Sequence, residues 1–462
     1  LLIGCTGCND ILDKGPRDKF SENDIWGSSE LAQAFLYPTL NDATDKLISY
    51  DHWSDNDIIQ DIPGTSNVNK EQIDNYYDAG WNQNVYSQIR KCNLMLQKME
   101  ENTSFIEQDR KYLTAQAKAL RGIIYYTRAR LFGKLMIVDK VIGENDNMEL
   151  PRTNTIKETY DFILNDLKES IADLPVTHGS QQGILTQGAV YALIAEIALQ
   201  GAAYIENGQE EYYSIAKKAS EDLFSLNQYE LDANYEKMFN EFDYAMGSKE
   251  IILADQRLES VFGLGVIGQM YNNDDAGWSS IVPTQNLVDM YEMDNGLTKE
   301  EATGYYDAKH PFANRDPRMD MTILYPGQEW RGKILNTLDE KLADGSKNKN
   351  FPTYTDNASK TALTWAKYLD PYEQYSNIWN TAACVIIFRY AEVLLSWAEA
   401  ENELNGPSDQ VYNYIDQIRE RVGMPKVVRT KYDTQDKLRE LIRRERCVEF
   451  AGEGLRRADI LR

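Results

Sequence analysis

The fold class is decided by the stretch Arg389-Tyr390-Ala391-Glu392-Val393-Leu394-Leu395-Ser396-Trp397-Ala398-Glu399-Ala400. Four small or aliphatic side chains of this stretch share one face at helical spacing: Ala391, Leu394, Leu395 and Ala398. That spacing predicts a helix over residues 389–404 with one face turned toward a core.

A second helix is predicted over residues 409–422. Its apolar residues form one stripe with helical spacing: Val411, Tyr414, Ile415, Ile418 and Val422. Ser408 is a suitable N-cap, and Gly423 with Pro425 ends the helix. Because the link Asn405-Gly406-Pro407 is short, we expect the two helices to form an antiparallel hairpin.

The same pattern recurs in the first half of the chain. Apolar periodicity predicts further helices over residues 83–100, 112–132, 156–174, 186–203 and 211–225. In the helix over 186–203 the alanines Ala189, Ala192, Ala195 and Ala198 would let a partner helix approach closely. Helix pairs of this size resemble tetratricopeptide hairpins, although no exact period of about 34 residues is present. The predicted fold is all-α, a tetratricopeptide-like scaffold of helical hairpins.

Between residues 226 and 388 the helical signal weakens. This stretch is rich in Asn, Asp, Gly, Tyr and Trp, and only short helices such as 284–293 are expected. A loop-rich region of this length is unusual in a helical protein unless it has a function. The expected parts of this single unit are a leader remnant over 1–8, an N-terminal helical block over 9–225, a loop-rich central lobe over 226–388, and C-terminal helices over 389–462 that pack back on the block.

Composition argues against several classes of function. The chain has 462 residues, with 49 Lys and Arg against 73 Asp and Glu, and a formal net charge of −24. Nucleic-acid binding is not expected, because neutralising phosphates requires clustered basic residues. No apolar run approaches the roughly 20 residues that cross a bilayer. The three histidines lie far apart in the sequence and the five cysteines form no paired zinc motif, so we expect neither a metal nor a cofactor.

The first residues resemble the end of a bacterial lipoprotein signal peptide. The segment Leu2-Ile3-Gly4-Cys5 is a short apolar run followed by a small residue and a cysteine. Cys5 is the expected lipidation site, and Cys8 is the alternative with a poorer preceding sequence. The other interpretation is an ordinary chain end with two free thiols.

Several motifs together carry a resemblance to a known family. They are Cys8-Asn9-Asp10-Ile11-Leu12-Asp13-Lys14-Gly15-Pro16, Ala117-Lys118-Ala119-Leu120-Arg121 with Tyr125 and Phe132-Gly133, Pro283-Thr284-Gln285-Asn286-Leu287-Val288-Asp289 with Asp294-Asn295-Gly296, and Asp316-Pro317-Arg318. The strongest is the stretch 389–400, which continues to Ile418-Arg419, Arg421, Glu445-Arg446, Glu449 and Glu453-Gly454-Leu455-Arg456. By these motifs the chain resembles, nearly end to end, the SusD/RagB family of surface glycan-binding lipoproteins of Bacteroidetes. Residues 134–138 depart from the family pattern, and members usually extend further, so we expect a truncated C-terminus at Arg462.

The resemblance implies a non-catalytic protein that captures an oligosaccharide or polysaccharide at the cell surface. Its implied partner is a SusC-like TonB-dependent transporter of the outer membrane, over which the lipid-anchored protein acts as a lid. One alternative is the peptide-binding lid of a peptide importer, for which an acidic groove would be evidence. The other is a surface glycoside hydrolase, but a chain with 73 acidic residues offers carboxylate pairs without specificity. No nucleophile elbow, phosphate loop or dinucleotide loop is present, so we expect no enzyme activity.

Aromatic residues beside amides and carboxylates mark the expected glycan site, because a sugar ring has an apolar face and a polar rim. Trp81 with Asn84 resembles a stacking tryptophan and a hydrogen-bonding asparagine of the starch-binding family member. Four further residues are expected on chemical grounds alone: Trp53, Tyr271, Trp278 and Trp330. For any single tryptophan the alternative is a structural role beneath a loop.

Charged residues within the motifs have a structural interpretation. They lie beside apolar helical stripes, where paired charges would join the helices: Arg121, Arg389, Glu392, Glu399, Arg419, Glu445 and Arg456. Buried pairs of this kind are weak evidence for stability, but we expect the loss of one partner to be costly.

Overall fold

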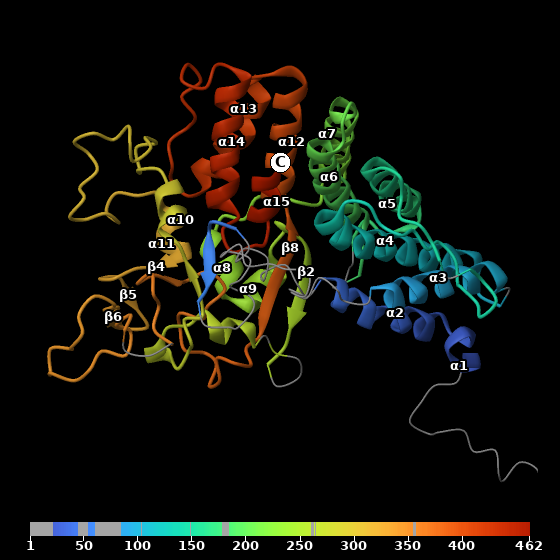
Figure 1. Ribbon diagram of the computed structural model, residues 1–462, viewed down its shortest axis with the longest axis horizontal. Coiled ribbons are helices and arrows are strands. Elements are labelled where there is room, and N and C mark those ends of the chain that lie inside the picture. Colours follow the sequence, from blue (N-terminus) through green and yellow to red (C-terminus); the bar gives the residue numbers. More distant parts are fainter. Residues whose placement is uncertain are drawn as a thin grey trace, which may run out of the picture.

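The computed structural model describes residues 22–44, 54–60, 85–102, 104–147, 149–177, 184–259, 263, 265–353 and 357–462. In Figure 1 the N-terminal helices lie on the right, the C-terminal helices at the top, and the short elements of the central segment at the lower left. The prediction of a helical, tetratricopeptide-like scaffold is confirmed.

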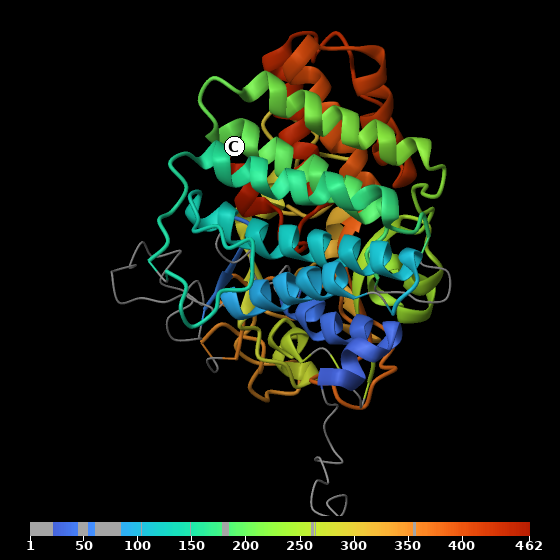
Figure 2. The same cartoon turned by 90° about the vertical axis from the view of Figure 1, so that its right-hand side faces the viewer.

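The helical block consists of helices that pack on their neighbours in the sequence. They are α1 (Glu22–Gly27), α2 (Ser29–Thr44), α3 (Tyr86–Glu101), α4 (Glu107–Phe132), α5 (Ile156–Ser170), α6 (Gln187–Tyr204) and α7 (Gln209–Ser225). Figure 2 shows them stacked side by side, and the contacts α3–α4, α4–α5 and α6–α7 are extensive. The predicted helices are all present, with α4 beginning five residues earlier than expected and α5 ending in a 3-10 turn (Ile171–Asp173).

Helix α6 is the centre of this block. It begins at the N-cap Thr186, whose side chain accepts a hydrogen bond from the Ala189 amide, and it is buried on nearly every side. Its close approach to α7 depends on Gly201, because a Cβ atom there would lie 2.5 Å from the Tyr212 ring and 3.1 Å from the Tyr160 ring. The expected close helix contact is therefore present, and a glycine as well as the alanines makes it possible.

The central lobe, residues 226–388, contains more strand than the sequence predicted. Its helices are α8 (Tyr235–Asn240), α9 (Phe242–Gly247), α10 (Gln285–Met290) and α11 (Pro317–Thr322). Among the described residues four antiparallel two-stranded sheets form: β1 (Asp57–Ile59) with β3 (Ile281–Pro283), β2 (Ile251–Arg257) with β8 (Ala383–Arg389), β4 (Ile323–Leu324) with β7 (Thr364–Trp365), and β5 (Glu329–Trp330) with β6 (Lys333–Ile334). Strand β8 has almost no alternation because both of its faces are buried, which explains why its sequence gave no clear signal.

The C-terminal part of the chain forms four helices, some of which contact the helical block. They are α12 (Tyr390–Asn405), α13 (Asp409–Arg421), α14 (Gln435–Glu449) and α15 (Arg456–Leu461). Helix α12 contacts α6 and α7 of the block on one side and α13 and α14 on the other. Ser408 caps α13 by accepting a hydrogen bond from the Val411 amide, as its sequence position indicated.

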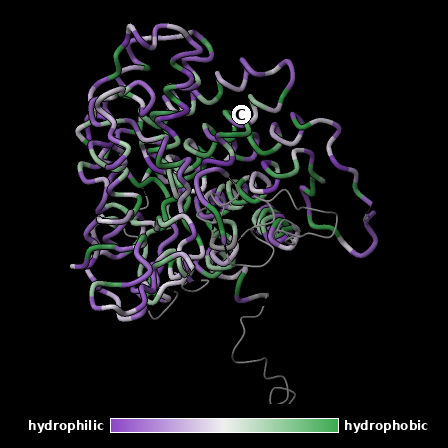
Figure 3. The backbone as a smooth tube through the Cα atoms, turned by 60° about the vertical axis from the view of Figure 1, so that its left-hand side comes forward, coloured by the Kyte–Doolittle hydropathy of each residue, from purple (hydrophilic) through white to green (hydrophobic). Residues whose placement is uncertain are grey.

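Buried apolar side chains of the described residues form three clusters, one in each part of the chain. Figure 3 shows hydrophobic segments toward the middle of the molecule and hydrophilic ones along its loops. The clusters cross the expected boundaries between the parts. Phe388 of β8 belongs to the cluster formed mainly by the helical block, and Val448 of α14 belongs to the cluster formed mainly by the lobe. The division at residues 225 and 388 therefore stays a prediction.

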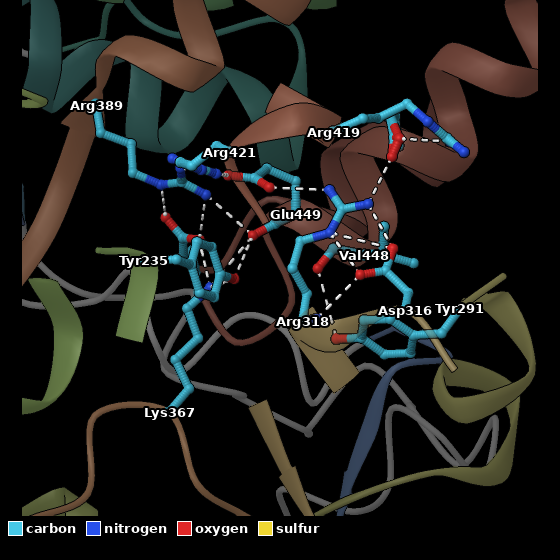
Figure 4. A network of polar contacts seen from close by, with 12 residues as sticks. Tyr235, Tyr291, Asp316, Arg318, Lys367, Arg389, Arg419, Arg421, Val448 and Glu449 are labelled. Carbon is cyan, nitrogen blue, oxygen red and sulfur yellow. Dashed lines mark hydrogen bonds and ion pairs between the residues drawn. The ribbon is translucent and has the colours of Figure 1, made fainter. Parts of the chain in front are cut away.

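A buried network of charges joins the lobe to the C-terminal helices (Figure 4). Glu449 of α14 accepts hydrogen bonds from Arg389 at 2.7 Å and Arg318 at 3.0 Å, and it also pairs with Arg421. Arg389 also binds Glu250 at 2.8 Å and Glu453 at 2.7 Å. The side chains of these residues are at most 5% exposed, so their charges are compensated inside the protein rather than by water.

Six of the seven charged residues in the motifs have the expected ion-pair partners. The pairs are Arg121–Asp166, Arg389–Glu449, Glu399–Arg462, Arg419–Glu292, Glu445–Arg318 and Arg456–Asp55. Glu392 differs, since within the described residues it has no ion-pair partner. Burial, reinforced by Glu196, raises its pKa well above 4.5, which favours the neutral form.

Replacing Gly201 by alanine should destabilise the protein by about 1–3 kcal/mol, because the added methyl group overlaps the Tyr212 ring. Urea unfolding measures this change. Gly247→Ala is the matched control, since a Cβ there meets no atom within 4 Å and should leave the unfolding free energy nearly unchanged. Equal stability of the two variants would show that α6 and α7 are less closely packed.

Replacing Glu449 by glutamine should cost about 3–5 kcal/mol at pH 7, because three buried guanidinium groups lose their shared carboxylate. Burial alone would raise the pKa of Glu449, but Arg421, Arg389 and Arg318 hold it well below 4.5. The native state then binds the proton more weakly than the unfolded state, so this contribution is present above pH 4.5 and lost as the pH falls below it.

Glu392→Gln gives the opposite dependence and serves as the matched control. Because the native pKa of Glu392 is raised, ionisation of this residue lowers the free energy of unfolding of the wild type as the pH rises above about 4.5. Glutamine does not ionise, so the variant lacks this loss. Urea unfolding between pH 4 and pH 8 should therefore show the variant gaining on the wild type with rising pH. A variant that falls behind the wild type would mean that Glu392 is ionised and paired.

Candidate functional site

Two tryptophans from distant parts of the lobe meet at its surface. The ring centroids of Trp278 and Trp379 are 4.5 Å apart and their planes are inclined by 58°. Trp278 is 45% exposed and Trp379 is half-buried. We call this pair the tryptophan platform. It is an apolar surface open to solvent, of the kind on which the flat face of a ring-shaped ligand can stack.

Gly268 contacts both tryptophan residues. Its carbonyl accepts a hydrogen bond from the Trp278 backbone amide at 3.1 Å, and the Trp379 ring packs against it. A Cβ atom at Gly268 would lie 2.4 Å from the Trp379 ring, so no larger residue fits without moving that ring. The loop carrying Trp278 is closed by a hydrogen bond from the Ser279 amide to the Tyr271 carbonyl at 2.9 Å.

Tyr271 and Trp330, both predicted ligand contacts, lie within the protein beside these loops. Tyr271 is fully buried, and its hydroxyl oxygen accepts a hydrogen bond from the Asp370 amide at 2.7 Å. Burial raises the pKa of Tyr271 far above its ordinary value, so the hydroxyl stays neutral. Trp330 is 8% exposed and donates from its indole Nε1 to Asp275 at 2.7 Å. In this structure both residues support the loops, and a direct ligand contact by either stays a prediction.

The carboxylates nearest to these aromatic residues are bonded within their own loops. Asp275 accepts from the Asn272 amide group at 2.7 Å as well as from Trp330. Asp370 accepts from the backbone amides of Tyr372 at 2.9 Å and Gln374 at 2.6 Å. These hydrogen bonds stabilise the loops.

Backbone strain gathers in the same loops. Of the nine described non-glycine residues with positive φ, five lie in the segments that carry or support the platform: Ala276, Ser279, Arg331, Tyr368 and Glu373. A left-handed backbone is unfavourable for such residues and persists only where surrounding contacts impose it. The clustering therefore indicates a constrained surface, as is common at binding sites.

The remaining predicted residues cannot be placed. Trp53, Trp81 and Asn84, and the lipidation candidates Cys5 and Cys8, lie outside the described residues. Trp379, in contrast, was not selected from the sequence, although Asn377 and Asn380 flank it as amides flank Trp81. That shared pattern is the signal that could have identified it.

A hollow lies in the helical block, beside the start of α4. It has a volume of about 680 Å³ and is lined by Glu107, Gln108, Asp109, Lys111, Tyr112 and residues 172–175. We call it the acidic cleft, because Glu107, Asp109 and Asp173 outnumber the single cation Lys111, which pairs with Glu107 at 2.7 Å.

Neither a metal centre nor a membrane span is visible in the described part of the chain. Across those ranges no three His, Cys, Asp or Glu side chains are grouped so that they could hold a metal ion. Within the same ranges no helix is both long and apolar enough to cross a bilayer.

Comparison with known proteins gives consistent matches. Residues 227–462 match the model of the SusD family, and residues 30–199 match a model described as starch-binding associating with outer membrane. SusD-like protein P25 of Formosa agariphila is 25% identical, covering 100% of this chain and 88% of its own. The starch-binding protein SusD of Bacteroides thetaiotaomicron is 25% identical over 75% of this chain and 63% of its own.

Solved structures show the same fold. A SusD-like protein from Bacteroides fragilis is 27% identical, covers 97% of this chain and 88% of its own, and superposes with a TM-score of 0.80. Because the SusD family model matches more than half of the residues, the chain belongs to the SusD family.

Proposed function

We propose that the protein binds a carbohydrate without cleaving it, at the tryptophan platform. The observation that carries this proposal is the exposed, tilted pair Trp278 and Trp379 on strained, tightly bonded loops. A sugar ring would stack its CH face on an indole while amides beside the rings, such as Asn377 and Asn380, accept and donate hydrogen bonds at its hydroxyl rim.

The family membership supports the wider setting of the proposal. The matched model concerns starch binding in association with the outer membrane, and one relative is a starch-binding protein. We therefore place the protein at the cell surface on the outer membrane, anchored through a lipid on Cys5 or Cys8, where it passes its ligand to a SusC-like TonB-dependent transporter.

Trp278→Ala and Trp379→Ala should each weaken binding to the cognate polysaccharide by about tenfold or more, because each removes one stacking face. Retardation in gels containing neutral, uronate or sulfated polysaccharides finds the ligand class, and calorimetry on the resulting oligosaccharide measures affinity. Tyr37→Ala, which removes an equally exposed aromatic ring on α2, is the control and should bind normally. Full affinity in both tryptophan variants would place the site elsewhere, and release of reducing ends would establish hydrolysis.

Gly268→Ala should also weaken binding, although it removes neither ring. The added methyl group must push Trp379 out of its position over the loop, which changes the platform geometry. Calorimetry with the same oligosaccharide measures the loss, and an unchanged melting temperature shows that the fold is intact. Wild-type affinity in this variant would mean that the relative placement of the rings is unimportant.

A second candidate, peptide capture, is favoured by the acidic cleft in the helical block. Its excess of carboxylates would attract Lys- or Arg-containing peptides by charge complementarity. The two candidates use separate surfaces, so Asp109→Asn with Asp173→Asn should reduce binding of a basic peptide library and leave glycan binding unchanged. Peptide binding lost in this variant, with no glycan bound by the wild type, would replace the carbohydrate proposal.

A further inference from the structure

We infer that Arg331 is the positioning residue that sets the relative orientation of Trp278 and Trp379. Within the described residues the Arg331 guanidinium contacts neither ring, so its effect acts through the loops that carry them. The consequence for ligand affinity rests on the proposed function, whereas the effect on the two rings does not.

Arg331 lies at the tip of the β5–β6 hairpin, yet its side chain points into the protein and is 7% exposed. The turn is formed by Arg331 and Gly332, with φ values of +50° and +71°. These values suit a two-residue hairpin turn, but they are unfavourable for an arginine. The buried contacts of the guanidinium hold the residue in this conformation.

The guanidinium joins three segments that are far apart in sequence. Its Nε and Nη2 donate to the Asp370 carbonyl at 2.9 and 2.7 Å. Its Nη1 lies 3.4 Å from the Asp275 carboxylate, and its Cζ lies 4.8 Å from the centroid of the Tyr271 ring. Arg331 therefore connects the hairpin to the loop of Trp278 and to the loop that leads to Trp379.

Each of the two loops that Arg331 contacts leads to one of the two tryptophans. Asp275 lies three residues before Trp278, and the Tyr271 carbonyl closes that loop through Ser279. On the other side Asp370 organises the backbone through Tyr375, four residues before Trp379, by accepting from the amides of residues 372, 374 and 375. The hydrogen bond from the Asp370 amide to the Tyr271 hydroxyl also links the two loops directly. Arg331 lies beside this hydrogen bond and contacts Asp370 in one loop and Asp275 and Tyr271 in the other.

Only an arginine can make this set of contacts. Its planar fork binds one carbonyl twice, faces a carboxylate and stacks on an aromatic ring at the same time, whereas a lysine presents a single point charge. The substitution Arg331→Lys is thus a test of geometry rather than of charge. Arg331→Gly is complementary, because glycine accepts the positive φ of the turn while the guanidinium is removed.

The experiment measures ring orientation directly. Two indoles 4.5 Å apart with inclined planes should give a pair of far-ultraviolet circular dichroism bands of opposite sign, which Trp278→Phe and Trp379→Phe assign to this pair. Arg315→Met is the matched control. Arg315 is a buried arginine of the same lobe that binds the Val288, Tyr291 and Pro311 carbonyls, away from the platform.

We expect Arg331→Gly and Arg331→Lys to lose the band pair and to speed amide exchange in residues 271–279 and 370–379. Affinity for the oligosaccharide should fall about tenfold or more in both variants. Arg315→Met should lower the melting temperature to a similar extent but keep the band pair, which separates positioning from general stability.

Two results would overturn the inference: a band pair and amide protection that persist in Arg331→Gly, or their equal loss in Arg315→Met. The outcome for the proposed function is separate. If the wild type binds no glycan while its band pair depends on Arg331, the positioning role stands and carbohydrate binding at the platform is refuted.

Discussion

The placement of the central lobe against the C-terminal helices depends on one buried carboxylate, that of Glu449. Arg389, Arg318 and Arg421 converge on it from the end of β8, from α11 and from α13. These residues belong to the central lobe and the C-terminal helices, so the network fixes the lobe against α12 and α14. Isolated buried ion pairs add little to stability, but each member here is costly to lose because its partners would remain charged and dry. The network therefore favours a single arrangement of the central lobe relative to the C-terminal helices.

The site depends on this anchorage because the lobe contains little regular structure of its own. Its strands are short, and much of its loop backbone is held by side chains such as Asp370, Asn348 and Asn272. Hydrogen bonds between a side chain and a nearby backbone group hold a loop in one conformation only if the elements around the loop are themselves held in place. The helical scaffold provides that frame, and the strained turns at Arg331 and Ser279 persist within it.

The two candidate ligands concern different parts of this architecture. The tryptophan platform lies on the lobe, where aromatic rings meet amides, whereas the acidic cleft lies at the start of α4 in the helical block. A stacking surface selects ring-shaped ligands through dispersion and desolvation, and an acidic cleft selects cations through long-range attraction. Membership of the SusD family agrees with the first, and the separation of the two surfaces lets each be tested alone.

The sequence by itself determined the helices and their hairpin pairing, because the period of the apolar residues is local information. Its motifs indicated the family. Trp278, which the sequence offers as a candidate ligand contact, is exposed in the structure. Only the tertiary structure decided that Tyr271 and Trp330 lie beneath the surface, that the Trp379 ring meets the Trp278 ring, and that the Arg331 guanidinium contacts both Asp370 and Asp275. The bond from Asp370 to Tyr271 spans 99 residues. The sequence shows that a loop is rich in aromatic and polar residues. Which of these side chains meet, and which face water, is decided by contacts between residues far apart in the sequence.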